Sequence, residues 1–282
     1  MQNATPETEG PLKDRRSAWH WLNEGFVLKA VFRGLLAGAV VVLVMDFMEI
    51  YERSEEELPG NSTQRAPVVM EPPSRRDQVR TYLPRATPKR ASSKGPSMPG
   101  YAKPPTDAAV GERMAFARGP KGEASAVGRI EVGTAGDFAQ FVRTQGGEIK
   151  TLYLHSPGGS VRDALQMSKL IRDSGINTVV PDDAYCASSC PIVFVGGKQR
   201  TAGTHAWLGV HQVYTSTEAQ GDVHMGVAHG QTVSAAVQDH LYAMGVDPRA
   251  WLKAMKTPSD QIYVFTPEEL SEYKVATRIA SR

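Results

Sequence analysis

LYLHSPGGSV at residues 152–161, YCASSCP at 185–191 and LGVHQ at 208–212 are the three motifs around which the chain is organised. Each motif adjoins a short apolar run of the length that buried strands have. Between the first two motifs, residues 161–173 place apolar side chains at helical spacing. A strand, a helix and another strand form the pattern of right-handed β-α-β units, which predicts an α/β fold with a largely parallel sheet.

Further elements flank these motifs on both sides. GRIEVG at residues 128–133 predicts a short strand, and TAGDFAQFVRT at 134–144 predicts a helix with two phenylalanines on one face. Downstream, the polar, glycine-rich tract 215–230 is typical of a mobile loop, and we expect the next helix over residues 232–244. Strands and helices therefore alternate through the C-terminal half of the chain.

The motifs together resemble a known enzyme family. SPGGSV, an Ala-Ser turn and an apolar strand ending in His-Gln are similar to the proteolytic subunit of Clp protease and its membrane-bound relatives, within the wider crotonase-like fold. The resemblance covers roughly residues 128–276, with several motifs in the same order and spacing. It implies a ClpP/crotonase-like β-α-β spiral core, a polypeptide substrate, no cofactor and assembly as a homo-oligomer.

The resemblance assigns a nucleophile and a base. The family carries its nucleophile in an A-S-x sequence at the start of a helix, which here selects Ser188, with Ser189 next in the chain. The spacing from Gly159 also favours Ser188, whereas Ser189 can serve as a helix N-cap. A serine hydroxyl is unreactive at neutral pH without a positioned base, and His211 looks like the family's catalytic histidine.

The third member of the triad is the acid that would orient the imidazolium. In the family an aspartate precedes a T-P-E-E segment, and here Asp260 precedes TPEE at residues 266–269, with an offset of one position. Asp247 and Asp239 are the alternatives. The other interpretation of Asp260 is a turn or helix-cap residue.

Backbone groups of the glycine-rich motif and of the nucleophile turn complete the predicted site. The resemblance assigns the oxyanion hole to the N–H groups of Gly159 and Ser189, and substrate binding to Gly158, Gly159 and Ser160. Glycine suits position 159 because a substrate carbonyl must approach the main chain without a Cβ in the way. Crotonase-like enzymes bind thioester enolates in a similar hole, so the hole alone does not indicate a peptide substrate.

The two cysteines of the chain, Cys186 and Cys190, bracket Ser188. Two thiols exclude a disulfide-rich scaffold and an all-cysteine zinc site. Outside the cytoplasm they can form a disulfide if their Cα atoms come within about 7 Å, and otherwise they are two small buried apolar side chains. A metal site at His224 and His229 lacks a third ligand at regular spacing, so we predict no metal.

Residues 26–48 predict a transmembrane signal anchor. The uncharged run 34–45 has only 12 residues, but snorkelling Lys29 and Arg33 extend the span to about 22 residues, or ~33 Å. The alternatives are a buried helix and a cleaved signal peptide, although no small-x-small cleavage signal follows. Basic residues concentrate before the span, which predicts a cytoplasmic tail over residues 1–25 and a periplasmic domain at a bacterial inner membrane.

Composition defines the rest of the organisation. Residues 51–110 carry 10 of the 19 prolines and few large apolar residues, so we predict a disordered linker over 49–115 and a hydrolase domain over 116–282. The net charge of +2 gives no global field for nucleic acid, and no nucleotide-binding motif occurs.

The sequence thus predicts a membrane-anchored serine peptidase with a Ser-His-Asp triad. One alternative is a catalytically inactive protein of the same fold that holds an extended peptide by strand addition. Another is an acyl-thioester hydrolase.

Overall fold

The computed structural model describes residues 24–57, 69–70, 78–82, 89–90, 95–144, 148–214 and 223–280. The chain divides into two compact units, Met1–Ala66 and Pro67–Arg282.

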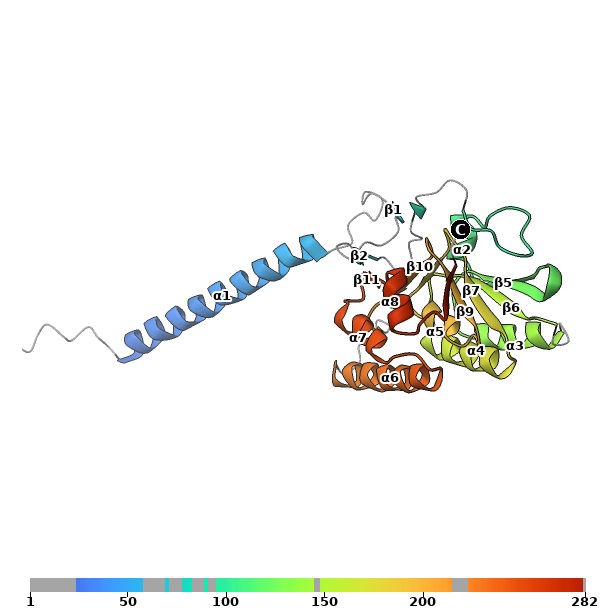
Figure 1. The fold of residues 1–282 in the computed structure, drawn as a ribbon. Helices are drawn as coiled ribbons and strands as arrows, with labels where there is room; N and C mark the ends of the chain where they lie inside the picture. Colours follow the sequence, from blue (N-terminus) through green and yellow to red (C-terminus); the bar gives the residue numbers. More distant parts are fainter. Residues whose placement is uncertain are drawn as a thin grey trace, which may run out of the picture. The chain divides into compact units, whose positions relative to one another are not determined.

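The described part of the first unit is a single long helix, α1 (Glu24–Glu57) (Figure 1). Its segment Leu28–Met48 has a mean hydropathy of 2.1 over 21 residues, which is long and apolar enough to cross a membrane. At 1.5 Å per residue this segment matches the ~30 Å of a hydrocarbon core. The helix extends beyond the predicted anchor of 26–48, and the tail 1–23 lies outside the described residues.

The second unit contains the remaining helices and all strands of the described residues. The helices are α2 (Asp107–Gly111), α3 (Thr134–Thr144), α4 (Val161–Asp173), α5 (Cys190–Phe194), α6 (Val223–Ala243), α7 (Arg249–Lys256) and α8 (Pro267–Glu272), with a 3-10 turn at Pro120–Gly122. The strands are β1 (Val69–Met70), β2 (Val79–Thr81), β3 (Lys89–Arg90), β4 (Ala115–Arg118), β5 (Glu123–Val127), β6 (Thr151–His155), β7 (Asn177–Val180), β8 (Tyr185–Ala187), β9 (Arg200–Gly203), β10 (Trp207–Val210), β11 (Gln261–Val264) and β12 (Arg278–Ala280).

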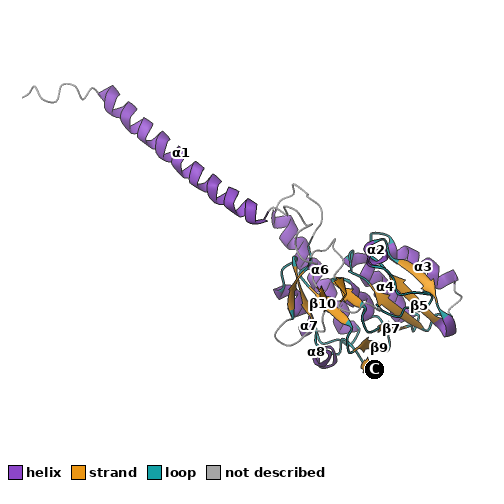
Figure 2. Cartoon of the chain, turned by 90° about the horizontal axis from the view of Figure 1, so that it is seen from above, coloured by secondary structure: helices purple, strands orange, loops and turns teal. Residues whose placement is uncertain are grey.

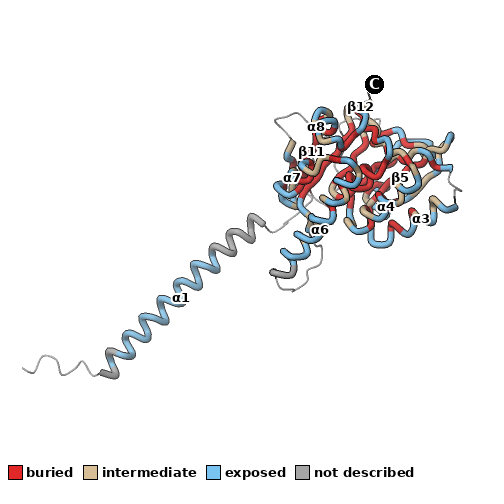
Figure 3. The backbone as a smooth tube through the Cα atoms, turned by 60° about the horizontal axis from the view of Figure 1, so that its bottom comes forward, coloured by how far each residue is buried: buried red, intermediate tan, exposed pale blue. Residues whose placement is uncertain are grey.

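A six-stranded sheet in the order β12-β9-β7-β6-β5-β4 forms the larger part of this unit (Figure 2). All its neighbours pair in parallel except β4 and β5, which confirms the largely parallel sheet. Buried residues gather along the strands, while α3, α4 and α6 carry exposed residues on their outer faces (Figure 3). The spiral arrangement of β-α-β units stays a prediction.

A four-stranded sheet in the order β2-β11-β10-β8 forms the second layer of strands. Strands β8 and β10 are parallel, whereas β11 is antiparallel to both β10 and β2. The carboxyl ends of β8 and β10 therefore lie at the same edge, and each is followed by a predicted catalytic residue.

Several element boundaries differ from the sequence-based expectations. The predicted helices 134–144 and 161–173 are confirmed as α3 and α4. The strand expected at 128–133 lies instead at β5, because EASAV is the run whose side chains are buried. Helix α6 begins at Val223, so the expected loop 215–230 is helical over its last part.

The predicted disordered linker also differs from the structure where residues are described. Strand β2 pairs with β11, Tyr82 after it is 3% exposed, and Val110 on α2 is fully buried. These few apolar side chains join a core cluster of the domain, and β11 satisfies the backbone of β2, so low hydrophobicity did not prevent ordering. The domain thus begins well before residue 116.

Candidate active site

The three sequence motifs meet at the carboxyl ends of β6, β8 and β10. Gly209 of β10 pairs with Ala187 of β8, and Ser156 after β6 bridges to Cys186. In this arrangement the SPGG loop runs along one side of the Ala187–Ser189 turn, and β10 runs along the other. The fold therefore brings together the SPGG loop, the turn that carries Ser188 and the end of the strand that precedes His211.

Ser188 occupies a strained turn between β8 and α5. Its φ is +61°, in the left-handed region that costs a residue with a Cβ roughly 1–2 kcal/mol. Its N–H donates to the carbonyl of Gly209 at 2.9 Å, which ties the turn to β10. Residues held in sparsely populated conformations cluster at functional sites, and this turn leaves the Ser188 side chain half-buried.

Ser189 lies at the N-cap position of α5, but its side chain makes no capping bond. The residue is 2% exposed, and its Oγ has no hydrogen-bond partner among the described residues. The predicted capping role of the hydroxyl is therefore absent from the structure. What Ser189 offers the site is its backbone N–H.

The two glycines of the SPGG loop allow close backbone approach. Gly158 has φ +86°, and a Cβ there would lie 2.7 Å from both the Ser188 Cβ and the Ser189 nitrogen. Gly159 has φ +142°, and a Cβ there would overlap the carbonyl oxygen of Ile130. Only glycine fits at either position, so Gly158 lies directly against the nucleophile turn and Gly159 lies directly against Ile130.

Two backbone N–H groups near Ser188 donate no hydrogen bond to any residue that the structure describes. The neighbours of Gly159 are fixed, since the Ile130 N–H donates to the Gly158 carbonyl at 2.9 Å and the Ser160 N–H donates to the Ile130 carbonyl at 2.6 Å. Neither the Gly159 N–H nor the Ser189 N–H donates a hydrogen bond within the described part of the chain. Free N–H groups held by rigid backbone are what an oxyanion hole requires.

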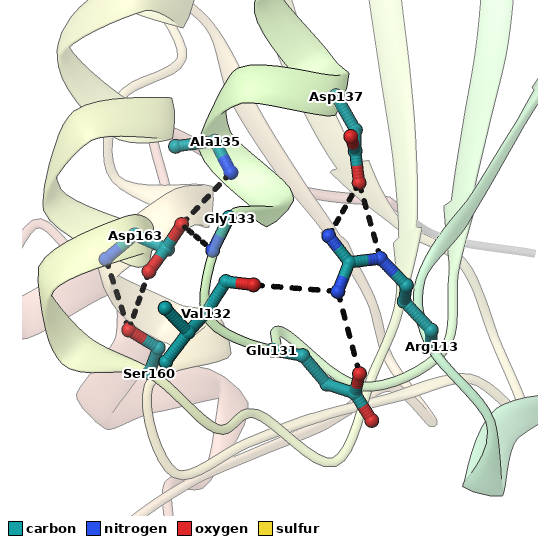
Figure 4. A network of polar contacts seen from close by, with 8 residues as sticks. All are labelled: Arg113, Glu131, Val132, Gly133, Ala135, Asp137, Ser160 and Asp163. Atoms are coloured by element: carbon teal, nitrogen blue, oxygen red, sulfur yellow. Dashed lines mark hydrogen bonds and ion pairs between the residues drawn. The ribbon is translucent and has the colours of Figure 1, made fainter.

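A carboxylate behind the loop holds it in place (Figure 4). Asp163 is 5% exposed, and its Oδ1 accepts hydrogen bonds from the N–H groups of Gly133 and Ala135 at 2.9 and 3.0 Å. Ser160 donates its hydroxyl to Asp163 Oδ2 at 2.6 Å and caps α4 by accepting from the Asp163 N–H at 3.2 Å. The Ser160 side chain, predicted to bind substrate, is thus engaged in joining the N-terminal ends of α3 and α4.

His211 has the tautomer and charge of a general base. Its Nδ1 lies 2.8 Å from the carbonyl oxygen of Gln212, and because a carbonyl only accepts, Nδ1 carries the proton. Nε2 therefore has a lone pair, and it is buried without a hydrogen-bond partner among the described residues. Burial lowers the pKa of His211 and outweighs the opposite effect of the Gln212 carbonyl, so the imidazole is neutral at neutral pH.

No hydrogen bond joins the predicted triad residues to one another in the described part of the chain. Within the described residues, no hydrogen bond joins Ser188 to His211 Nε2. Asp260 is exposed, and its carbonyl rather than its carboxylate is engaged, accepting from the Tyr82 N–H at 2.7 Å. Of the alternatives, Asp247 forms an ion pair with Arg249, and Asp239 lies exposed on α6. The identity of the acid stays a prediction.

Cys186 and Cys190 form a disulfide around the turn. Their Cα atoms lie 5.0 Å apart, and both residues are fully buried. The bond closes a short loop whose centre is Ser188. It therefore constrains the backbone of the nucleophile turn from both sides.

Sequence reasoning missed Tyr82. Its ring centroid lies 5.4 Å from that of His211, and its hydroxyl donates to the Pro157 carbonyl at 2.6 Å. Tyr214 also contacts the imidazole, with centroids 5.6 Å apart. No local pattern marks Tyr82, because it lies in a proline-rich stretch with no periodicity.

No metal site is evident in the part of the chain that the structure describes, since no group of three His, Cys, Asp or Glu side chains is suitably placed there. His229 is exposed on α6.

Comparison with known proteins leaves the family open. No protein-family model and no curated protein sequence matches the chain. Among solved structures it is similar to a point mutant of ClpP1 from Listeria monocytogenes, with 14% sequence identity, a TM-score of 0.46, and coverage of 57% of this chain and 92% of that chain. At this identity and TM-score, the likeness identifies neither a family nor an activity.

Proposed function

We propose that the chain is a membrane-anchored serine hydrolase that cleaves peptide bonds, with Ser188 as nucleophile and His211 as general base. The observation that carries this proposal is the setting of Ser188. It lies in a left-handed turn, and the nearby N–H groups of Gly159 and Ser189 donate no hydrogen bond among the described residues. The neutral His211 follows the neighbouring strand β10.

In the proposed reaction, Ser188 Oγ attacks the substrate carbonyl carbon while its proton passes to His211 Nε2. The N–H groups of Gly159 and Ser189 bind the resulting oxyanion, and loss of one such donor typically costs about 3–4 kcal/mol. The tetrahedral intermediate collapses as the imidazolium gives its proton to the leaving amine. Water then attacks the acyl-serine while His211 takes its proton; the bond between the acyl carbon and Ser188 Oγ breaks, His211 returns the proton to Oγ, and the carboxylic acid product leaves.

The Ser188 hydroxyl must rotate to reach His211, since the two are not hydrogen-bonded in this structure. Catalytic hydrogen bonds are often loose in the absence of substrate. In this structure the Gln212 carbonyl, which accepts a hydrogen bond from Nδ1, orients the His211 ring. Asp260 remains our sequence-based proposal for the acid, and it requires that the carboxylate moves to Nδ1 in place of that carbonyl.

The same proposal places the enzyme at a bacterial inner membrane, held by α1 with its N-terminus in the cytoplasm. The basic residues before the apolar segment support this orientation. The disulfide supports a periplasmic domain, because disulfides persist in oxidising compartments. Digestion of the domain by protease added to intact spheroplasts would support the orientation, and protection there would contradict it. Assembly as a homo-oligomer is part of the proposal and is tested by the mass of the detergent-solubilised protein.

A second function, peptide binding without catalysis, is favoured by one observation: Ser188 and His211 are not hydrogen-bonded. A fluorophosphonate probe, which reacts only with an activated serine, separates the two functions in the full-length protein. We expect labelling that Ser188→Ala abolishes and that Ser189→Ala, which keeps the Ser189 N–H, retains. Labelling that persists in Ser188→Ala would contradict the assignment of Ser188 as nucleophile. Absence of labelling in the intact protein would favour the binding function.

A further inference from the structure

Residues 78–82, here called the docked segment, reach the site from the proline-rich part of the chain. At one end, the Val264 N–H donates to the Gln78 carbonyl at 2.7 Å, and the Gln78 amide donates to the Val264 carbonyl at 3.1 Å. The Gln78 amide also donates to Glu269 of α8. At the other end, the Tyr82 N–H donates to the Asp260 carbonyl. The segment is thus fixed at both ends.

Between these ends, β2 pairs with β11 along its length. Arg80 lies with its guanidinium 5.3 Å from the centroid of the Trp207 ring, and it is 9% exposed. The docked segment is therefore an integral edge strand of the sheet that carries His211. Its position along β11 determines where Tyr82 lies.

The Tyr82 side chain connects the two halves of the proposed site. Its hydroxyl donates to the carbonyl of Pro157, the residue immediately before the two glycines of the SPGG loop. Its ring packs at a 40° tilt on the His211 ring. The Pro157 carbonyl lies in the Pro157–Gly158 peptide plane, directly before the plane that carries the Gly159 N–H, so this bond supports the loop beside the oxyanion donor. The ring covers part of the imidazole.

We infer that Tyr82 is a positioning residue of the hydrolase, which holds the base His211 and the oxyanion donor of the SPGG loop in register with each other. The inference rests on the proposed function, in which these two groups act on one carbonyl. Tyr82 touches neither nucleophile nor substrate in this role.

The groups around His211 indicate that Tyr82 acts on the imidazole through packing rather than through charge. Burial is the main cause of the lowered pKa of His211, and the Gln212 carbonyl opposes it. The described ring contacts of His211 are Tyr82 and Tyr214, and only Tyr82 is buried, since Tyr214 is 43% exposed. Burial also raises the pKa of Tyr82 far above neutral pH, so its hydroxyl stays a donor to Pro157.

Three variants of the full-length, detergent-solubilised protein test the inference. Tyr82→Phe keeps the ring but leaves the Pro157 carbonyl unbonded, and we expect fluorophosphonate labelling to slow about tenfold with the pKa of His211 unchanged. Tyr82→Ala admits water, so labelling slows further and the pKa of His211 rises toward its ordinary value of 6.5. Tyr242→Ala, at a residue that is 77% exposed on α6, is the control, with labelling within about twofold of the native rate.

The pKa of His211 is measured by NMR on protein labelled in its histidine side chains, with His211→Gln assigning the signal. A native labelling rate in Tyr82→Phe, or an unchanged pKa in Tyr82→Ala, would overturn the inference, even if the melting temperature falls. If Tyr82→Ala does not fold, Tyr82→Leu keeps apolar bulk and replaces it. If the native protein does not label, the proposed function fails, yet the NMR titration still decides whether Tyr82 controls His211.

Discussion

Reduction of the Cys186–Cys190 disulfide should both destabilise the domain and slow the reaction of Ser188. The bond joins residues four positions apart. For a closed loop of about five residues, the loss of chain entropy in the unfolded state corresponds to about 2 kcal/mol. In a domain of this size that free energy lowers the melting temperature by about 4–8 °C.

The same free energy is comparable with the cost of the Ser188 conformation, which is roughly 1–2 kcal/mol for a left-handed residue with a Cβ. Without the cross-link, the turn can relax toward an ordinary φ. If relaxation is favoured by about 1 kcal/mol, the fraction of competent turns falls about fivefold, and labelling slows by that factor.

Urea unfolding of the native chain, with and without a phosphine reductant, measures the stability difference through the buried Trp207 and Trp251. Because both cysteines are fully buried, reduction must be carried out on unfolded protein before refolding. Cys186→Ala/Cys190→Ala is the control, which should not respond to reductant. A difference below about 0.5 kcal/mol would refute the entropy calculation. Unchanged labelling in the reduced protein would show that other contacts hold Ser188.

Three further outcomes are expected. Gly159→Ala should abolish labelling, because its Cβ would overlap the Ile130 carbonyl. Its control is Gly136→Ala on α3, where a Cβ meets no other atom; this variant should be labelled at the native rate and should stabilise the domain by about 0.5–1 kcal/mol. Burial lowers the pKa of His211, so below about pH 6.5 the unfolded chain binds more protons at this residue than the folded chain, and the free energy of unfolding should decline from there toward the lowered pKa. The acid limb of the labelling rate should likewise lie below pH 6.5. His211→Gln should flatten this part of the stability curve. Because Asp260 is the proposed acid, Asp260→Asn should slow labelling by ~10⁴-fold, although its side chain is exposed in the resting structure; a change of less than about threefold would show that it is not the acid.

The sequence predicted the elements whose signal is local. Helices α3 and α4 match their expected bounds because apolar side chains recur at helical spacing over more than ten residues. The SPGG loop and the turn at Ser188 could be placed because glycine and small residues are physically required there. Periodicity alone does not separate strand from helix in the short run after the turn. Its five residues form α5, in which a proline occupies the first turn, where its missing N–H costs nothing.

The contacts that complete the site could not be predicted, because they join residues far apart in the chain. Tyr82 and His211 are in contact, but no pattern in the sequence links the two segments on which they lie. Composition argued for disorder over the docked segment, but composition does not reveal that β11 has an unpaired edge to cover. The orienting partner of His211 is likewise a backbone carbonyl, which every residue has and no motif marks.

The backbone of the nucleophile turn is held on three sides, and this limits what activation can involve. The Ser188 N–H is bonded to Gly209, the Ala187 N–H is bonded to the Ser156 carbonyl at 2.9 Å, and the disulfide spans the turn. The freedom that remains to Ser188 is rotation of its side chain, which occurs in picoseconds to nanoseconds for accessible residues. We therefore expect Ser188 to pair with His211 by rotation of its side chain, without backbone rearrangement, so that labelling begins without a lag. A lag on the timescale of seconds would mean that the docked segment or the SPGG loop must first move, and that the two halves of the site are not in register in the resting protein.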